Sequence, residues 1–318
     1  MRIFVAGATG AVGRRLVPRL VNRGHRVTGL TRTPAKTDLL RKLGAEPVVA
    51  DALDEKAMHD AVVAARPDVI VHQLTDLKGA SDLRKFDRTF ASSNRLRTAG
   101  TDYLLAAAQD CGAKRIVAQS FCGWPYARIG DHVKTEDAPL DRNPPQELRG
   151  TLDAIRHLEH AVTTTPGLVG VALRYGGFYG PDTGFCEPSV LEQIRKRRMP
   201  LIGGGTGWWS FLHVDDAAEA ASLAVDRGEG IYNIVDDDPT PVRDWLMATA
   251  KMLGAKPPFR VPAWLGRLVA GQHLVVMMTE SRAGSNARAK RELGWLPHYP
   301  SWRQGFSEII EREIRSAV

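Results

Sequence analysis

Cysteine is scarce in this sequence, and its placement excludes two common uses of the thiol group. The 318 residues include only Cys111, Cys122 and Cys186, with no Cys-x-x-Cys spacing and no clustered histidine partners. This pattern supports neither a disulfide framework nor a zinc site. We interpret the three thiols as buried or incidental side chains and expect no metal site.

Long hydrophobic runs are also missing. No uninterrupted apolar stretch approaches the roughly 20 residues that a membrane-spanning helix needs. A predicted strand begins at residue 2 and leaves no room for a charged leader and an apolar segment, so we expect a cytoplasmic protein with no membrane partner. The apolar segment 264–278 is interpreted as lobe core rather than as a membrane contact.

Positive charge is in excess, with a formal net charge of +7 and a pI near 9.4. The basic residues are dispersed, however, and the densest run, 195–198, lies on a predicted helix just before Pro200. A solvated helix end explains this run better than a polyanion site does. We therefore expect no nucleic-acid partner.

The first thirteen residues carry the most informative pattern. Residues 3–6 form a short apolar run that predicts a strand, and Gly7, Gly10 and Gly13 follow directly before an amphipathic helix that ends at Gly24. Glycines let backbone amides approach a ligand closely, and the positive end of a helix dipole favours a phosphate. The pattern predicts a dinucleotide site in a Rossmann-like α/β fold.

Acidic residues are absent between Gly7 and Asp38. In dinucleotide folds an acidic residue about 20 positions after the glycines binds the adenosine ribose, whereas an arginine there suits the 2′-phosphate of NADP. Arg32 occupies this place after the second predicted strand, with Arg14 and Lys36 nearby. The sequence therefore predicts NADP, with NAD as the less favoured cofactor.

The glycine spacing and three later segments resemble the extended short-chain dehydrogenase/reductase superfamily, in its epimerase/dehydratase-like branch. These segments are the helix containing Gly100-Thr101, the stretch from Leu173-Arg174 to Tyr179-Gly180-Pro181, and Leu293-Gly294-Trp295-x-Pro297. The resemblance covers nearly the whole chain. It implies a doubly wound parallel sheet with a smaller C-terminal α/β substrate lobe.

The same resemblance divides the chain into two parts. Residues 1–180 would form the NADP-binding domain, to which 209–236 return, and 181–208 with 237–318 would form the substrate lobe. The expected partner is a small molecule, and a homodimer is a candidate assembly.

Several sites for the cofactor are implied along one edge of the sheet. Asp51 would face the adenine or cap the next helix, with Asp54 able to take the other role. His72 is interpreted as structural, and Asn94 as the start of a long helix. The predicted cofactor-binding residues are Gly7, Thr9, Gly10, Ala11, Val12, Gly13, Arg14, Arg32, Lys36, Asp51, Ala52, Leu74, Thr75, Asn94, Ser120, Tyr175, Gly176, Gly177 and Phe178.

The catalytic Tyr-x-x-x-Lys pair of the resembling family is absent from the whole chain. Anchoring the relevant helix on Glu159 places Thr151 and Ile155 at these two positions. Ser120 matches the Ser or Thr that contacts the reacting oxygen in the family. Tyr126 is our candidate proton donor, on the expectation that the cofactor's ribose region or Lys134 lowers its pKa. Packing beside Trp124 is the alternative role for Tyr126.

Aromatic residues stand where a nucleotide sugar would need charge. Trp209 occupies a position at which the family often carries an arginine, and Trp208, Phe121 and Trp124 complete the predicted substrate residues. This favours an apolar or aromatic substrate, although the aromatics could equally pack the lobe. Asp215 and Asp216 are interpreted as helix caps rather than as a catalytic pair.

These observations together predict an NADP-dependent oxidoreductase that reduces a carbonyl or related unsaturated group on a fairly apolar small molecule. The nicotinamide would supply the hydride, and the protein would position the substrate against it. A redox-neutral epimerase, dehydratase or isomerase and a non-enzymatic NADP-binding sensor remain as alternatives.

Overall fold

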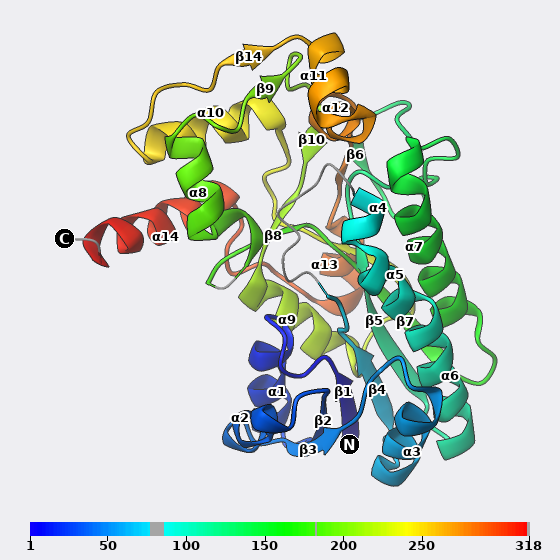
Figure 1. The fold of residues 1–318 in the computed structure, drawn as a ribbon. Helices are drawn as coiled ribbons and strands as arrows, with labels where there is room; N and C mark the ends of the chain where they lie inside the picture. Colours follow the sequence, from blue (N-terminus) through cyan, green and yellow to red (C-terminus); the bar gives the residue numbers. More distant parts are fainter. Residues whose placement is uncertain (77–85, 182, 317–318) are drawn as a thin grey trace.

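A parallel sheet of seven strands organises the fold, as the sequence predicted (Figure 1). The structure is a computed structural model that describes residues 1–76, 86–181 and 183–316. The strand order is β3-β2-β1-β4-β5-β7-β12. The strands are β1 (Arg2–Ala6), β2 (Arg26–Thr31), β3 (Glu46–Val49), β4 (Val69–His72), β5 (Arg115–Phe121), β7 (Val169–Tyr175) and β12 (Gly230–Ile234).

The strand order reverses between β1 and β4, which pair with Ala6 opposite His72. In open α/β sheets, ligands bind beyond the carboxyl ends of the strands at such a reversal. The glycine-rich turn follows β1 directly, so it lies at this crevice. The fold thus places the predicted dinucleotide site where the sheet topology favours one.

Helices cover both faces of the sheet (Figure 1). On one face, α1 (Gly13–Asn22) and α9 (Val214–Ala224) bury apolar residues such as Leu16, Leu20 and Ala221 against the sheet. On the other, α3 (Glu55–Ala65), α6 (Ala99–Cys111) and α7 (Gln146–Thr164) do the same with Met58, Leu104 and Leu158. The two apolar clusters, one on each face, hold the doubly wound arrangement together.

The long helix expected from Asn94 is interrupted. Asn94 lies inside α5 (Ala91–Arg97), and α6 starts afresh at Ala99. Thr98 between them has φ −96° and ψ −91°, outside the helical region. The prediction of one continuous helix is therefore wrong, because its apolar periodicity carries no signal for this local break.

A third apolar cluster, away from the sheet, supports the substrate lobe. Phe211 and Trp245 pack at 5.7 Å between ring centroids, and Phe306 lies 5.8 Å from Phe211. The contributing helices are α8 (Pro188–Arg195), α10 (Val242–Met252), α12 (Gln272–Thr279) and α14 (Trp302–Ser316). The separate core agrees with a distinct lobe, while the domain boundaries given above stay a prediction.

Short elements complete the described chain. Among these elements, whose bounds follow, short strands pair in twos: β8 with β11, β9 with β14 and β6 with β15 are parallel, and β10 with β13 is antiparallel. They are η1 (Pro34–Lys36), α2 (Thr37–Lys42), α4 (Phe86–Thr89), β6 (Val133–Lys134), β8 (Gly177–Tyr179), η3 (Gly184–Cys186), β9 (Leu201–Ile202), β10 (Trp208–Trp209), β11 (Phe211–His213), β13 (Thr240–Pro241), β14 (Arg260–Val261), α11 (Ala263–Ala270), β15 (Ala283–Gly284) and α13 (Ala287–Leu293).

Two structural expectations for the C-terminal half need correction. The segment 264–278 is divided at Gly271, and only α12 buries its apolar residues, including Val275 and Met278, whereas α11 exposes Trp264 and Leu268. It is therefore core only in its second half.

The predicted capping role of the carboxylate pair is the other error. The N-cap of α9 is His213, which accepts a hydrogen bond from the Asp215 amide. Asp216 is buried and accepts from the amides of His298 and Tyr299, so it anchors a distant loop.

Candidate cofactor and active site

The glycine-rich turn forms a backbone cradle that side chains would fill. Gly7 has a φ of +92°, and a Cβ there would lie 2.5 Å from the Gln73 carbonyl oxygen. A Cβ on Gly13 would lie 2.2 Å from the Gly7 carbonyl oxygen. Because these contacts are too close for any side chain, the turn can bring Thr9, Ala11 and neighbouring amides close to a ligand.

Helix α1 starts at the end of this turn with its N-terminus uncapped by any described side chain. Its N-cap, Val12, makes no side-chain hydrogen bond, and its first turn contains no acidic residue. The helix dipole, with no acidic residue in the first turn, therefore offers an environment suited to an anion. The cradle fits the pyrophosphate of a dinucleotide, with Arg14 on the first turn of the helix.

Two basic residues lie where the adenosine end would bind. Arg32 directly follows β2, its side chain is 60% exposed, and its Nη2 lies 3.6 Å from the Asp76 carboxylate. Lys36 ends the short helix η1. After β3, Asp51 accepts a hydrogen bond from the Leu53 amide, while Asp54 caps α3. Arg32 is thus held by Asp76, and contacts of Arg32, Lys36, Asp51 and Ala52 with a cofactor stay predictions.

Residues after β4 and β7 border the opposite end of the crevice. Leu74 and Thr75 follow β4 and are partly exposed, and the Gln73 side-chain amide donates to the Tyr175 hydroxyl at 3.3 Å. His72 is fully buried beside Thr101, and burial lowers its pKa to about 4. This supports a structural role for His72.

The turn after β7 brings the chain close to strand β11. A Cβ on Gly176 would lie 2.9 Å from the Ser210 carbonyl oxygen, and Gly177 pairs with Phe211. Phe178 packs 5.4 Å from the Tyr175 ring. A cofactor role stays a prediction for the four consecutive residues Tyr175, Gly176, Gly177 and Phe178.

The positions of the missing catalytic pair are filled by a different hydrogen-bond network. The Thr151 hydroxyl accepts from the Asn94 amide at 3.0 Å and donates to the Asp87 carboxylate at 3.3 Å. The carboxylate also accepts from the backbone amides of Gly150 and Thr151. Ile155, at the lysine position, is buried. This helix face therefore presents a carboxylate-bound threonine instead of a phenol and an ammonium group.

Ser120 lies deeper in the sheet than a reacting group at the edge would. Its hydroxyl donates to Glu159 at 2.6 Å. Glu159 follows Thr151 by eight residues on α7, so the Ser120–Glu159 contact lies about 12 Å along the helix axis from Thr151. To contact a substrate, the serine hydroxyl would have to give up its hydrogen bond to Glu159. A catalytic role for Ser120 stays a prediction.

Tyr126 belongs to the buried hydrogen-bond network that contains Ser120, Glu159 and Arg174. Its hydroxyl donates to the Asn233 side-chain oxygen at 2.6 Å and accepts from Arg174 at 3.0 Å. Burial raises the pKa of Tyr126 above its usual range, and Lys134 is bonded to the Ile129 carbonyl instead. The lowered pKa expected from the sequence is therefore wrong, and a role for Tyr126 as acid must work against this shift.

The predicted substrate aromatics occupy three different environments. Phe121 and Trp124 lie 6.3 Å apart, and Trp124 also contacts Phe86 of α4 at 5.8 Å. Trp208 stacks on His132. Trp209 packs into the lobe core, where its indole N–H donates to the Met277 carbonyl. Trp209 is thus committed to the lobe core, and a substrate role for Phe121, Trp124 and Trp208 stays a prediction.

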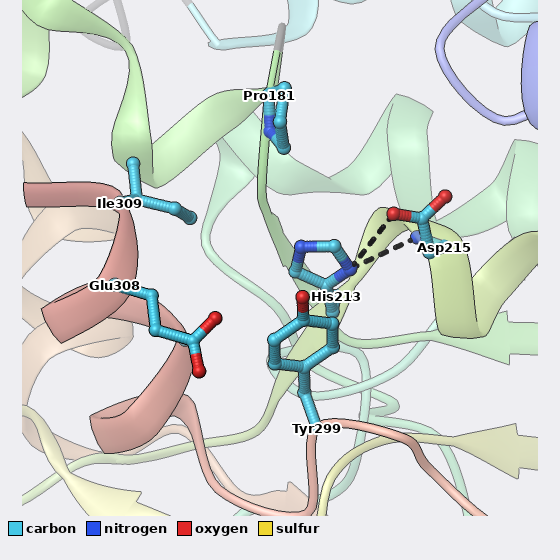
Figure 2. A pocket seen from close by; sticks show the side chains of 7 residues that line it. Pro181, His213, Asp215, Tyr299, Glu308 and Ile309 are labelled. Carbon is cyan, nitrogen blue, oxygen red and sulfur yellow. Dashed lines mark hydrogen bonds and ion pairs between the residues drawn. The ribbon is translucent and has the colours of Figure 1, made fainter. Parts of the chain in front are cut away.

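A small cavity lies between α9 and α14 (Figure 2), next to Arg15 of α1, which contacts Pro181 and Asp215 in its lining. Its volume is about 60 Å³, and His213 at its centre stacks on Tyr299 at 3.9 Å. Burial lowers the pKa of His213 to about 4, so the ring is neutral near pH 7. This volume holds at most a few water molecules and does not accommodate a substrate. Within the described ranges, no cluster of three or more His, Cys, Asp or Glu side chains could hold a metal ion.

Three relevant residues were missed by the sequence reasoning. Asp76, Asp87 and Phe86 lie in the stretch 76–90, which the sequence describes only as polar and charged with helical pieces. Their importance comes from contacts with Arg32, Thr151 and Trp124, which are far away in the sequence. No pattern in a single sequence could have indicated these pairings.

The sequence of this chain matches a known protein family and is similar to reductases from other organisms. Residues 3–235 match the family described as "NAD dependent epimerase/dehydratase family". A 3-diazoavenalumate denitrifying reductase from a Streptomyces species is 42% identical over 308 residues, covering 96% of this chain and 99% of that protein. A 4-hydroxy-2-methyl-3-oxo-4-farnesyl-3,4-dihydroquinoline-1-oxide ketoreductase from Stigmatella aurantiaca is 27% identical, covering 93% and 92% respectively.

Solved structures share the same fold. UDP-glucose 4-epimerase from Thermotoga maritima, determined with UDP-glucose, has a TM-score of 0.76 at 21% identity and covers 100% of both chains. A human epimerase family protein, determined with NADPH, has a TM-score of 0.74 at 21% identity, covering 98% of this chain and 99% of that one. At these identities the similarity concerns the fold alone.

Proposed function

The chain belongs to the NAD-dependent epimerase/dehydratase family, and from this premise we propose that it is an NADPH-dependent reductase of an unsaturated group on an aromatic or otherwise apolar small molecule. It is an enzyme of the oxidoreductase type with a nicotinamide dinucleotide as cofactor. The observation that carries the proposal is the network of Thr151, Asn94 and Asp87 at the place of the usual catalytic pair.

Two features support NADPH as the cofactor. Arg32 is exposed at the end of β2, and positions 8–37 contain no carboxylate that would repel a 2′-phosphate. Asp76 holds Arg32 from the far side of β1, so the arginine must exchange this partner for the phosphate. The cofactor, when bound, supplies the hydride.

We expect NADPH to bind at least about tenfold more tightly than NADH, a difference of about 1.4 kcal/mol. Arg32→Asp should remove this preference, because it replaces the phosphate partner with a like charge. Fluorescence titration of both cofactors measures the effect. Arg41→Asp is the matched control, since its side chain is 61% exposed on α2 near by. Equal affinities in the wild type, or an equal loss in the control, would contradict the NADP assignment.

The charge at the Thr151 network favours an electrophile that needs no proton from the protein. Reduction of a ketone adds hydride to carbon and a proton to oxygen, and a carboxylate close by would oppose the developing negative charge. An arenediazonium ion is already cationic. Hydride addition breaks its C–N bond and yields the arene C–H bond and N₂, with no proton consumed.

The diazo group in the name of the relative that is 42% identical supports this choice of electrophile. A carbonyl group is the second candidate, because another relative is named as a ketoreductase. For a carbonyl, Tyr126 is the phenol we propose as acid despite its raised pKa. The two electrophiles therefore predict different sensitive residues.

A pair of variants separates the two chemistries. With an aryldiazonium salt, we expect NADPH oxidation and N₂ release in equal amounts, about tenfold lower kcat/KM in Asp87→Asn, and a change within about twofold in Tyr126→Phe. With an aryl ketone, Tyr126→Phe should instead lower the rate about 10²-fold. Reactions without protein give the background, and thermal melting checks that both variants fold.

The outcomes decide the proposal as follows. A wild type that oxidises NADPH with neither electrophile, yet retains cofactor after purification, would favour redox-neutral chemistry and contradict a reductase. A diazonium reaction that Asp87→Asn leaves unchanged would remove Asp87 from substrate binding.

A further inference from the structure

Helix α11 turns several large apolar side chains away from the lobe core. Trp264, Leu268 and Val269 are 63%, 77% and 60% exposed, and their spacing places them on one side of the helix. The opposite side packs inward, since a Cβ on Gly266 would lie 2.6 Å from Ile202. Clustered exposed apolar residues of this kind mark an interaction surface, whereas isolated ones do not.

The segment around this helix contains basic residues but no acidic residues of its own. No acidic residue occurs between Asp244 and Glu280, a stretch that includes Lys256, Arg260 and Arg267. All three of these basic residues are exposed. A partner for this surface must therefore combine apolar and negatively charged groups.

The fold adds a basic run to the same surface, in which Arg195 and Lys196 pair with Glu192. This run, 195–198, ends α8, and Arg197 donates from Nε to the Pro257 carbonyl at 2.9 Å. The Arg197 guanidinium also lies 5.9 Å from the centre of the exposed Phe259 ring. Pairing of β9 with β14 holds the two basic stretches together at the outer end of the lobe (Figure 1). The basic apolar patch comprises Arg197, Lys256, Phe259, Arg260, Trp264, Arg267, Leu268 and Val269.

Against the expectation from the sequence of no membrane partner, we propose that the basic apolar patch docks the protein onto the surface of a membrane that contains anionic lipids. Tryptophan and leucine side chains insert at the boundary between headgroups and acyl chains, and flanking lysines and arginines contact the lipid phosphates. No helix in the described parts of the chain has the length and apolar character needed to cross a bilayer, so the contact is confined to the surface. This docking is independent of the proposed reaction.

Charge disfavours a second copy of the chain as the occupant. A twofold contact through α11 would bring Arg260 and Arg267 towards their own copies, with no carboxylate in the segment to pair with them. A nucleic acid would match the charge but would leave Trp264 and Leu268 exposed. An anionic lipid surface satisfies both properties of the patch.

Cosedimentation with vesicles tests the proposal on the whole protein. We expect at least about tenfold stronger binding to vesicles of phosphatidylcholine with phosphatidylglycerol than to phosphatidylcholine alone, and a loss of binding at high salt. Trp264→Ser/Leu268→Ser and Arg260→Glu/Arg267→Glu should each weaken binding at least about tenfold. Leu296→Ser and Arg291→Glu are matched controls, because Leu296 is 70% exposed and the Arg291 side chain 66% exposed outside the patch.

Each other outcome overturns the proposal. Absence of vesicle binding, equal binding to neutral vesicles, or equal losses in the controls would exclude specific docking by this patch. Self-association without lipid that Trp264→Ser/Leu268→Ser abolishes, in a protein that ignores vesicles, would identify a second copy as the occupant. Binding to duplex DNA but not to vesicles, sensitive only to Arg260→Glu/Arg267→Glu, would identify a polyanion site.

Discussion

Gly13→Ala is expected to weaken NADPH binding by about 10²-fold, or about 2.7 kcal/mol. The new Cβ would lie 2.2 Å from the Gly7 carbonyl oxygen and 2.7 Å from the Ala8 backbone. Both contacts involve main-chain atoms, which cannot swing away as a flexible side chain can. The turn would have to shift, and the amides at the start of α1 would lose their alignment with a bound pyrophosphate.

Titration of NADPH fluorescence measures this loss. Gly100→Ala is the control, because a Cβ at that position meets its nearest neighbour at 3.7 Å, an ordinary contact distance. The control should bind NADPH as the wild type does. Unchanged affinity in a folded Gly13→Ala protein would show that the glycine turn does not hold the cofactor.

Arg174→Met is expected to lower the free energy of unfolding by about 3–5 kcal/mol, because it leaves the Glu159 charge buried without its partner. The two side chains are 4% and 5% exposed, and Nη2 of Arg174 lies 2.7 Å from the Glu159 carboxylate. The same guanidinium donates to Tyr126. The double variant Arg174→Met/Glu159→Leu should recover part of the loss, since no charge remains unpaired.

Chemical denaturation gives both free energies. Arg195→Met is the matched control, because Arg195 pairs with Glu192 at the same 2.7 Å while the two side chains are 44% and 41% exposed. Water screens this exposed pair, so its loss should cost at most about 1 kcal/mol. Similar losses in Arg174→Met and Arg195→Met would mean that burial adds nothing to the role of the Arg174–Glu159 pair.

The two halves of the proposed active site differ in how well the sequence predicts them. The glycine-rich turn is local: its glycines, strand and helix lie within 22 residues, and the structure places Gly7, Gly10 and Gly13 together. The catalytic half is not local. Thr151 meets Asp87 across 64 positions, and Tyr126 meets Asn233 across 107. Side chains this far apart leave no mutual pattern in one sequence.

Burial explains where the prediction for Tyr126 failed. The sequence places a phenol six residues after a strand end, and an exposed loop there would have left its pKa open to nearby positive charge. In the structure the side chain is 1% exposed, and burial raises the pKa instead. Exposure depends on how strands and loops pack, which the local pattern does not contain.

The sequence by itself determined the parallel sheet, the glycine cradle and the absence of the Tyr-x-x-x-Lys pair, because apolar periodicity, glycine spacing and residue identity are all local properties. Only the tertiary structure decided which groups replace that pair and how the apolar segment 264–278 is divided. Gly271 breaks this segment, with a φ of +91°, so that α12 enters the core while Trp264 and Leu268 face outward. The physical reason is that burial and charge pairing arise from contacts between distant elements.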